Sequence, residues 1–260
     1  MHVQVRSEGM LRSVNEIIGY KIKASNGEVG KVADFLFDDR QWTIRYLVVD
    51  TGSWLVDGLV LISPHSLGEP EWKSQEFGVK LSKEQVKKSP KIENDLPISR
   101  QHEIELAKYY GWPDYWSRMG TAFGPGPVLS MQKITSHYDT STEKTEEEYD
   151  LHLRSTNEIM KYNISATDGE LGHVHDLIVD DEKWQIRYFV VDTKKILPGK
   201  KVLCDINWIQ TVDFTKSKLD VQLSQDSIKN SPEYNPAEPI NREYEEQLYD
   251  FCGRPYRWWE

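Results

Sequence analysis

The chain has 260 residues, of which 38% are hydrophobic and 28% are charged, and its formal net charge at pH 7 is −10. This composition is typical of a soluble globular protein, and the length fits one large domain or two ordinary ones. No segment of the sequence is basic, so it lacks the positive face needed to bind nucleic acid phosphates or an anionic membrane surface. We therefore expect neither nucleic acid nor a membrane as a partner.

The sequence also lacks targeting and disulfide signals. No apolar run approaches the roughly 20 residues that span a bilayer, and residues 1–12 lack the continuous apolar stretch of a secretory signal. Cys204 and Cys252 are the only cysteines, and two cysteines are too few for a disulfide framework. We expect a cytoplasmic protein in which Cys204 is a buried structural thiol.

The strongest feature is an internal repeat. Leu11–Thr51 aligns with Leu153–Thr193 without a gap, and more than half of the aligned residues are identical. The same offset continues toward the end of the chain, where Gly111 aligns with Gly253. Self-similarity at a fixed period indicates a repeated structural unit. The predicted domains are therefore residues 1–116 and 153–260, joined by a polar, acidic linker at 117–152 that contains glycine and proline.

The first part of each copy predicts short strands. Apolar and polar residues alternate, and Asn26-Gly27 and Asp168-Gly169 supply the tight turns that connect paired strands. Closing so small a sheet into a barrel would remove its exposed edges. The expected strands of the first copy are Tyr20–Ala24, Gly30–Phe37, Trp42–Asp50, Leu59–Ile62 and Phe77–Leu81.

The last part of each copy predicts two helices. Ser82 followed by Gln85 is typical of a capping box, and Pro97-Ile98-Ser99 opens a second helix that stops at Gly111. In the second copy Asn241 is the corresponding cap. The expected fold is mainly β with α: two tandem small β-barrels, each followed by short C-terminal helices.

Several motifs of the first copy together resemble the PRC-barrel family, and its trailing segments are similar to a stand-alone bacterial branch with tandem repeats. These motifs are Asn15–Tyr20, Gly27–Gly30, Asp38-Asp39, Trp42–Thr51, Val60–Pro64, Pro97–Arg100 and Gly111–Trp116. The resemblance implies a six-stranded barrel that serves as a docking module and has no general catalytic motif. Within this family the chain is distantly similar to the cytoplasmic part of the reaction-centre H subunit and to the C-terminal part of a ribosome-maturation factor. The second copy departs from the pattern at Ile206 and Arg254.

Two groups of residues in the strands are candidates for chemistry. His173 and His175 lie two apart and would share a strand face, with Asp176 beside them, so they are weak candidates for a metal site. The first copy lacks both histidines, which argues against a metal site here. Arg45 could contact Asp34 across the hairpin, as Arg187 could contact Asp176, most simply as an ion pair that fixes the strand register.

Aromatic residues crowd the tail of each copy. Such side chains pack a helix onto its own barrel, and they are also favoured anchors at interfaces between copies or with a partner. The interaction candidates are Tyr109, Trp112, Tyr115, Trp116, Phe251, Tyr256, Trp258 and Trp259.

These observations predict a non-catalytic adaptor in which two linked docking barrels bind an unidentified protein partner, because linked modules gain avidity. No catalytic residue and no cofactor is expected. One alternative is a small-molecule or metal-sensing domain, or a minor enzyme, that uses His173 and His175. The other is a structural pseudo-dimer in which the two copies pack on each other.

Overall fold

The computed structural model describes residues 9–55, 58–90, 98–115, 152–193 and 200–257. Residues 9–115 are called the first half below, and residues 152–257 the second half. Trp116, Trp258 and Trp259 lie outside the described residues, as does the predicted linker except for His152.

The two halves contain the same series of elements. In the first half these are β1 (Leu11–Ser13), α1 (Val14–Ile17), β2 (Lys21–Ala24), β3 (Gly27–Asp38), β4 (Thr43–Asp50), β5 (Leu59–Ile62), β6 (Leu67–Glu71), β7 (Glu76–Val79), α2 (Lys83–Lys87) and α3 (Arg100–Tyr110). In the second half they are β8 (Leu153–Ser155), α4 (Thr156–Ile159), β9 (Asn163–Ala166), β10 (Gly169–Asp180), β11 (Gln185–Asp192), β12 (Lys201–Asp205), β13 (Ile209–Asp213), β14 (Lys218–Val221), α5 (Gln225–Asn230) and α6 (Arg242–Cys252).

The helix signals of the sequence are confirmed. Ser82 and Gln85 form a reciprocal capping box at the start of α2, which satisfies backbone donors that have no partner within the helix. Ser99 caps α3, and Gly111 ends it in the left-handed conformation. Asn241 and Gly253 do the same for α6. Glycine adopts this conformation without the steric cost that a Cβ imposes.

The strands of the described residues all belong to one sheet, in which a ten-strand path runs from β13 to β6 and four further strands pair along it. The two halves meet where Gln185 of β11 pairs with Thr43 of β4. The prediction of two closed barrels is not confirmed, because the path is open among the described residues. In the first half β5 leads into a one-turn 3₁₀ helix at Pro64–Ser66. This turn separates β5 from β6, and no ladder joins the two strands.

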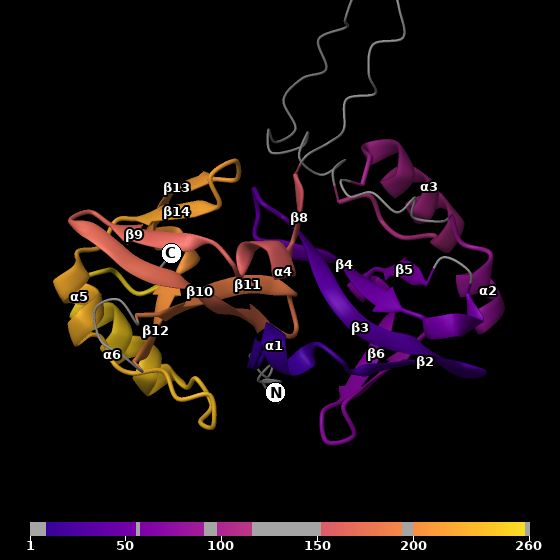
Figure 1. Ribbon diagram of the computed structural model, residues 1–260. Helices are drawn as coiled ribbons and strands as arrows, with labels where there is room; N and C mark the ends of the chain where they lie inside the picture. The colour runs from indigo at the N-terminus through magenta and orange to yellow at the C-terminus, as the bar shows by residue number, and fades with distance from the viewer. Residues whose placement is uncertain (1–8, 56–57, 91–97, 116–151, 194–199, 258–260) are drawn as a thin grey trace, which may run out of the picture.

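The first strand of each half pairs with the other half. β1 runs antiparallel to β10, with Leu11 opposite Asp180, and β8 runs antiparallel to β3, with Leu153 opposite Asp38. Figure 1 shows the short helices α1 and α4 between the two lobes, with the longer helices on the outer sides. The two halves therefore exchange their N-terminal segments, β1–α1 and β8–α4, reciprocally.

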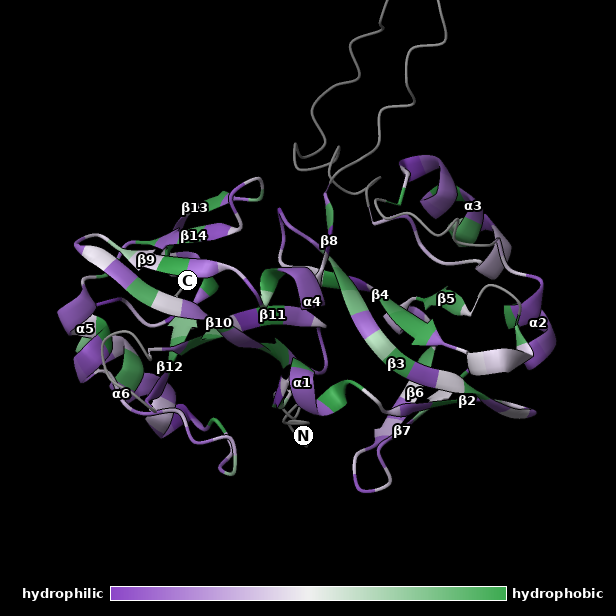
Figure 2. Ribbon diagram, in the orientation of Figure 1, coloured by the Kyte–Doolittle hydropathy of each residue, from purple (hydrophilic) through white to green (hydrophobic). Residues whose placement is uncertain are grey.

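One hydrophobic core extends across both halves. Trp42 and Trp184 join them: Trp42 stacks on Phe37 of its own half and meets Phe189 of the other edge to face. The backbone N–H groups of Ile44 and Ile186 each donate to the carbonyl of the opposite tryptophan at 2.7 Å. Figure 2 shows that the strands carry most hydrophobic residues, whereas the outer helices are largely hydrophilic.

No helix in the described part of the chain has both the length and the apolar character required to cross a membrane.

Candidate functional site

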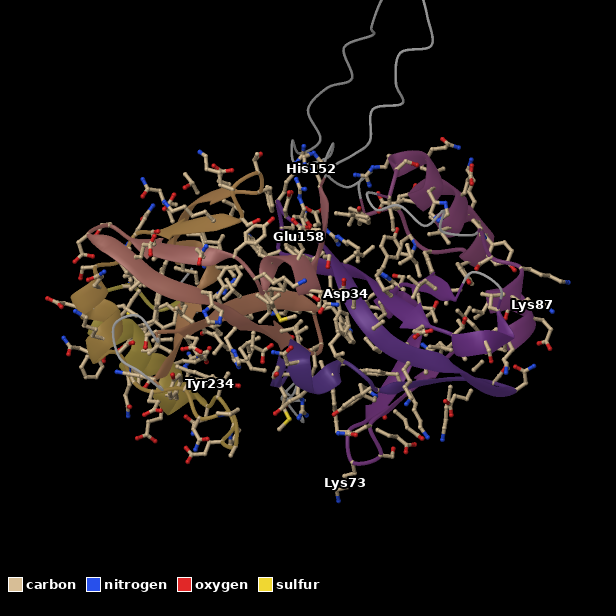
Figure 3. The ribbon with its side chains drawn as sticks, viewed as in Figure 1. Asp34, Lys73, Lys87, His152, Glu158 and Tyr234 are labelled. Carbon is tan, nitrogen blue, oxygen red and sulfur yellow. The ribbon has the colours of Figure 1, made fainter. Side chains whose placement is uncertain are left out.

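The buried carboxylate of Asp34 holds the exchanged segment β8–α4 on the first half. It accepts hydrogen bonds from the hydroxyls of Ser155 (2.5 Å) and Thr156 (2.7 Å) and from the backbone N–H of Asn157 (3.1 Å). The backbone N–H of Phe35 also donates to it, at 2.7 Å. Figure 3 places Asp34 at the junction of the lobes, below Glu158 of α4. One carboxylate thus accepts hydrogen bonds from three donors at the start of a helix that belongs to the other half.

Asp176 has the same role in the second half. Ser13 donates to it through its hydroxyl at 2.5 Å and Asn15 through its backbone N–H at 3.1 Å. Burial raises the pKa of Asp176, against the lowering effect of the donors from Ser13, Asn15 and Leu177. The two clusters are related by the sequence repeat, so both exchanged segments are anchored in one way.

The predicted pairing of Arg45 with Asp34 and of Arg187 with Asp176 is wrong. Arg45 contacts Asp38 at 3.3 Å, and Arg187 contacts Asp180 at 3.7 Å. The reason is a register shift in β3 next to Asp34, with a matching one in β10. The carboxylates at these bulges face the exchanged segments instead of the arginines.

A second group of polar residues lies on β10 and β11. His173, His175 and Asp192 each place one ligand atom within 4.8 Å of the others. Asp176, the third candidate from the sequence, is not in this group because its carboxylate faces Ser13. Asp192 takes its place, since it lies opposite His173 in the β10–β11 pair. Imidazole and carboxylate are ligands that zinc and related divalent metals prefer.

Lys201 of β12 lies beside this group, with its Nζ atom 2.7 Å from Nε2 of His175. Burial lowers the pKa of His175, and the Lys201 ammonium lowers it further. A neutral imidazole is the form that binds metal, but the Lys201 ammonium already contacts Nε2 of His175, the nitrogen through which a metal would bind. Metal binding through Nε2 of His175 therefore requires Lys201 to move away.

The aromatic candidates of the first half pack mainly on their own half. Trp112 donates to the Ser66 hydroxyl at 2.7 Å and stacks on Tyr110. Tyr115 lies over the guanidinium of Arg45, with 3.9 Å between the guanidinium carbon and the ring centre. Tyr109 is 40% exposed, and its hydroxyl donates to a backbone carbonyl of α2.

In the second half the aromatic candidates differ in exposure. Tyr256 is partly buried and donates to Asp250 at 2.7 Å. Phe251 is 57% exposed on α6, which makes it the most exposed aromatic among the described candidates. Phe251 and Tyr109 are therefore the exposed members of the set, whereas the other described candidates pack locally.

The exchange of β1–α1 and β8–α4 between the halves was not predicted from the sequence. Ser13 and Glu16, like Ser155 and Glu158, have the spacing of a helix start, and each serine caps its short helix. That signal locates the helices α1 and α4. It does not locate their partners, because both halves offer the same receiving residues.

These features define a mainly β protein in which an open sheet is flanked by helices and two halves are intertwined. Residues 11–73 match the model of the PRC-barrel domain family, so the first half contains a PRC-barrel domain that runs from β1 to the turn after β6. No curated protein matches this chain.

Proposed function

We propose that this chain is a non-catalytic docking protein whose two halves are both PRC-barrel-like units and act as one rigid scaffold. The supporting observation is the reciprocal exchange of β1–α1 and β8–α4. Each half receives a strand and a helix turn from the other, so neither half is complete without the segment that the other half supplies. A partner would then meet a single fixed arrangement of surfaces instead of two barrels that move independently on a tether.

Charge and exposed apolar residues support a protein as the partner. The net charge of −10 disfavours nucleic acid. Phe251 and Tyr109, both exposed, lie on α6 and α3, the outer helices of the two lobes. Exposed aromatic side chains are the residues that most often anchor protein interfaces. Because the lobes are joined by one sheet, the spacing of these two helices is fixed.

Limited proteolysis within residues 117–151, followed by affinity capture from native lysate, tests this function. The nicked chain is expected to elute as one species and to retain the same partner as the intact chain. Phe251→Ala and Tyr109→Ala should weaken capture, while Lys73→Ala, on the exposed turn between β6 and β7, should not. Nicked halves that separate and still bind independently would refute the single scaffold, and specific capture of no protein would refute docking.

A metal-responsive role is the second candidate, favoured by the group formed by His173, His175 and Asp192. Titration of the full chain with Zn²⁺, followed by calorimetry, tests it. His173→Ala should abolish binding, and His65→Ala, outside the group, should not affect it. Lys201→Met should strengthen binding because the competing ammonium is removed. Absence of binding to both the original chain and the Lys201 variant would exclude this role.

A further inference from the structure

A cavity of about 940 Å³ lies in the second half, between the exchanged segment β1–α1 and the outer helix α6. Figure 3 labels Tyr234, one of the residues at its wall. Its polar lining comes from four separate parts of the chain, and the residues that matter below are Arg187, Lys183, Glu245 and Arg257.

In the first half the side chain of Tyr115 lies against Arg45, the residue that corresponds to Arg187. Its ring lies 3.9 Å from the guanidinium carbon of Arg45. Its hydroxyl donates to Glu103 at 2.7 Å, and Arg100 donates to that hydroxyl at 3.0 Å. Tyr46 donates to the same carboxylate at 3.1 Å. A phenol ring is therefore held by stacking on an arginine and by a hydrogen bond to a buried carboxylate.

The second half keeps the receiving groups and lacks the ring. Arg187 and Glu245 stand at the positions of Arg45 and Glu103, and Tyr188 donates to Glu245 at 2.5 Å, as Tyr46 does to Glu103. Arg257 stands where Tyr115 would be, and its side chain turns to the carboxylate of Asp205 at 3.3 Å.

Arg187 has also lost a polar partner. In the first half Arg45 donates to the side-chain oxygen of Gln41 at 2.5 Å, but the corresponding residue in the second half is Lys183, which has no acceptor. The Nε atoms of Arg187 and Arg45 are both buried without a hydrogen-bond partner among the described residues, so the difference between the halves lies at the face of the guanidinium and not at Nε. Arg187 lines the cavity, at the place where the first half has the ring of Tyr115 over Arg45.

From this comparison we propose that the cavity binds a hydroxyaryl group, with the ring stacked on Arg187 and the hydroxyl donating to Glu245. Any aromatic ring can stack on an arginine, whereas a charge-assisted hydrogen bond to a carboxylate requires a ring that carries a donor. Basic and acidic side chains line the cavity in equal number, which fits a neutral hydroxyaryl group. The group is either the side chain of a tyrosine in a peptide or a free phenol. This inference does not depend on the docking role proposed above.

Nuclear magnetic resonance of the full chain labelled with ¹⁵N tests the proposal, because the Nε–H signal of Arg187 reports directly on the cavity. The probes are N-acetyl-tyrosinamide, p-cresol and N-acetyl-phenylalaninamide. Both hydroxyl probes should shift the Arg187 signal. The phenylalanine probe should bind about tenfold more weakly than the tyrosine probe because it lacks the charge-assisted hydrogen bond. Equal affinity of these two matched amides would overturn the assignment.

The variant Arg257→Tyr should place a ring on Arg187 as Tyr115 lies on Arg45, and binding of both hydroxyl probes should be lost. Lys73→Tyr adds a tyrosine on a distant exposed turn and should leave binding unchanged. Glu245→Gln is the second variant, with an expected loss of about tenfold for the hydroxyl probes only. Undiminished binding to either cavity variant would refute the proposal. A tyrosinamide that binds more tightly than p-cresol identifies a peptide as the source, and the reverse order identifies a free phenol.

Discussion

Replacing Asp34 with alanine should destabilise the protein strongly, because this carboxylate is the anchor of an exchanged segment. It is buried, and four donors converge on it: two hydroxyls and the two backbone N–H groups of Phe35 and Asn157. In Asp34→Ala the hydroxyls of Ser155 and Thr156 are free to rotate, but the backbone groups are fixed. The N–H of Phe35 keeps a longer contact with Thr156 Oγ1 at 3.4 Å, whereas the N–H of Asn157 loses its acceptor. A buried donor left without a partner costs about 1–3 kcal/mol, and the two lost hydroxyl hydrogen bonds cost about 1 kcal/mol each, so the expected loss is about 3–4 kcal/mol.

The corresponding variant in the second half gives an internal comparison. Asp176 accepts from Ser13, Asn15 and Leu177. Val14 stands where the other cluster has Thr156, so one hydroxyl donor is missing. Asp176→Ala should therefore cost about 1 kcal/mol less than Asp34→Ala, on the scale of one hydrogen bond.

Urea unfolding of the full chain, followed by tryptophan fluorescence, measures these differences. Asp226→Ala is the control, because its side chain is 82% exposed and its loss should change the free energy of unfolding by less than about 0.5 kcal/mol. A loss below about 1 kcal/mol for Asp34→Ala would show that the carboxylate does not anchor the segment.

Two further predictions concern other parts of the sheet. In Gly30→Ala the new Cβ would lie 2.0 Å from the carbonyl oxygen of Asp50, so β3 and β4 must separate, at a cost of about 1–3 kcal/mol in thermal or urea unfolding. Gly78→Ala has nothing within 4 Å and should be tolerated; equal costs would contradict the clash. His175 should titrate below 6.5 because burial and Lys201 lower its pKa, so its contribution to stability is complete above pH 6.5 and declines as the pH falls toward the pKa of the folded state. Histidine resonances followed against pH check this, and Lys201→Met should raise the His175 pKa; no change would exclude the ammonium as a cause.

Local signals in the sequence predicted the elements well. The caps at Ser82, Ser99 and Asn241 and the stop at Gly111 depend on residues within one or two turns of the helix end, and all four are confirmed. Barrel closure was not confirmed, since it depends on whether β5 meets β6 across the turn at Pro64–Ser66. No local pattern encodes that relation.

The exchange between halves lies beyond sequence reasoning for a different reason. Ser13 finds the same partners in either half, because Asp34 and Asp176 are equivalent in the repeat. The preference between pairing within a half and pairing across halves then depends on chain geometry and on the shared core around Trp42 and Trp184. The sequence did place His173 and His175 together, but Asp192 became their neighbour only through the register of β10 and β11.

The exchange also has a consequence for the order of synthesis. The first half receives its outer strand from β8, which follows residues 117–151 in the chain. A ribosome adds about 5–20 residues per second, so for several seconds after the first half emerges the edge of β3 and the carboxylate of Asp34 lack their final partner, the segment β8–α4. The N-terminal lobe therefore cannot reach its final pairing until the C-terminal lobe has begun to appear, and in the meantime its own β1–α1 is the equivalent segment that competes for the edge of β3.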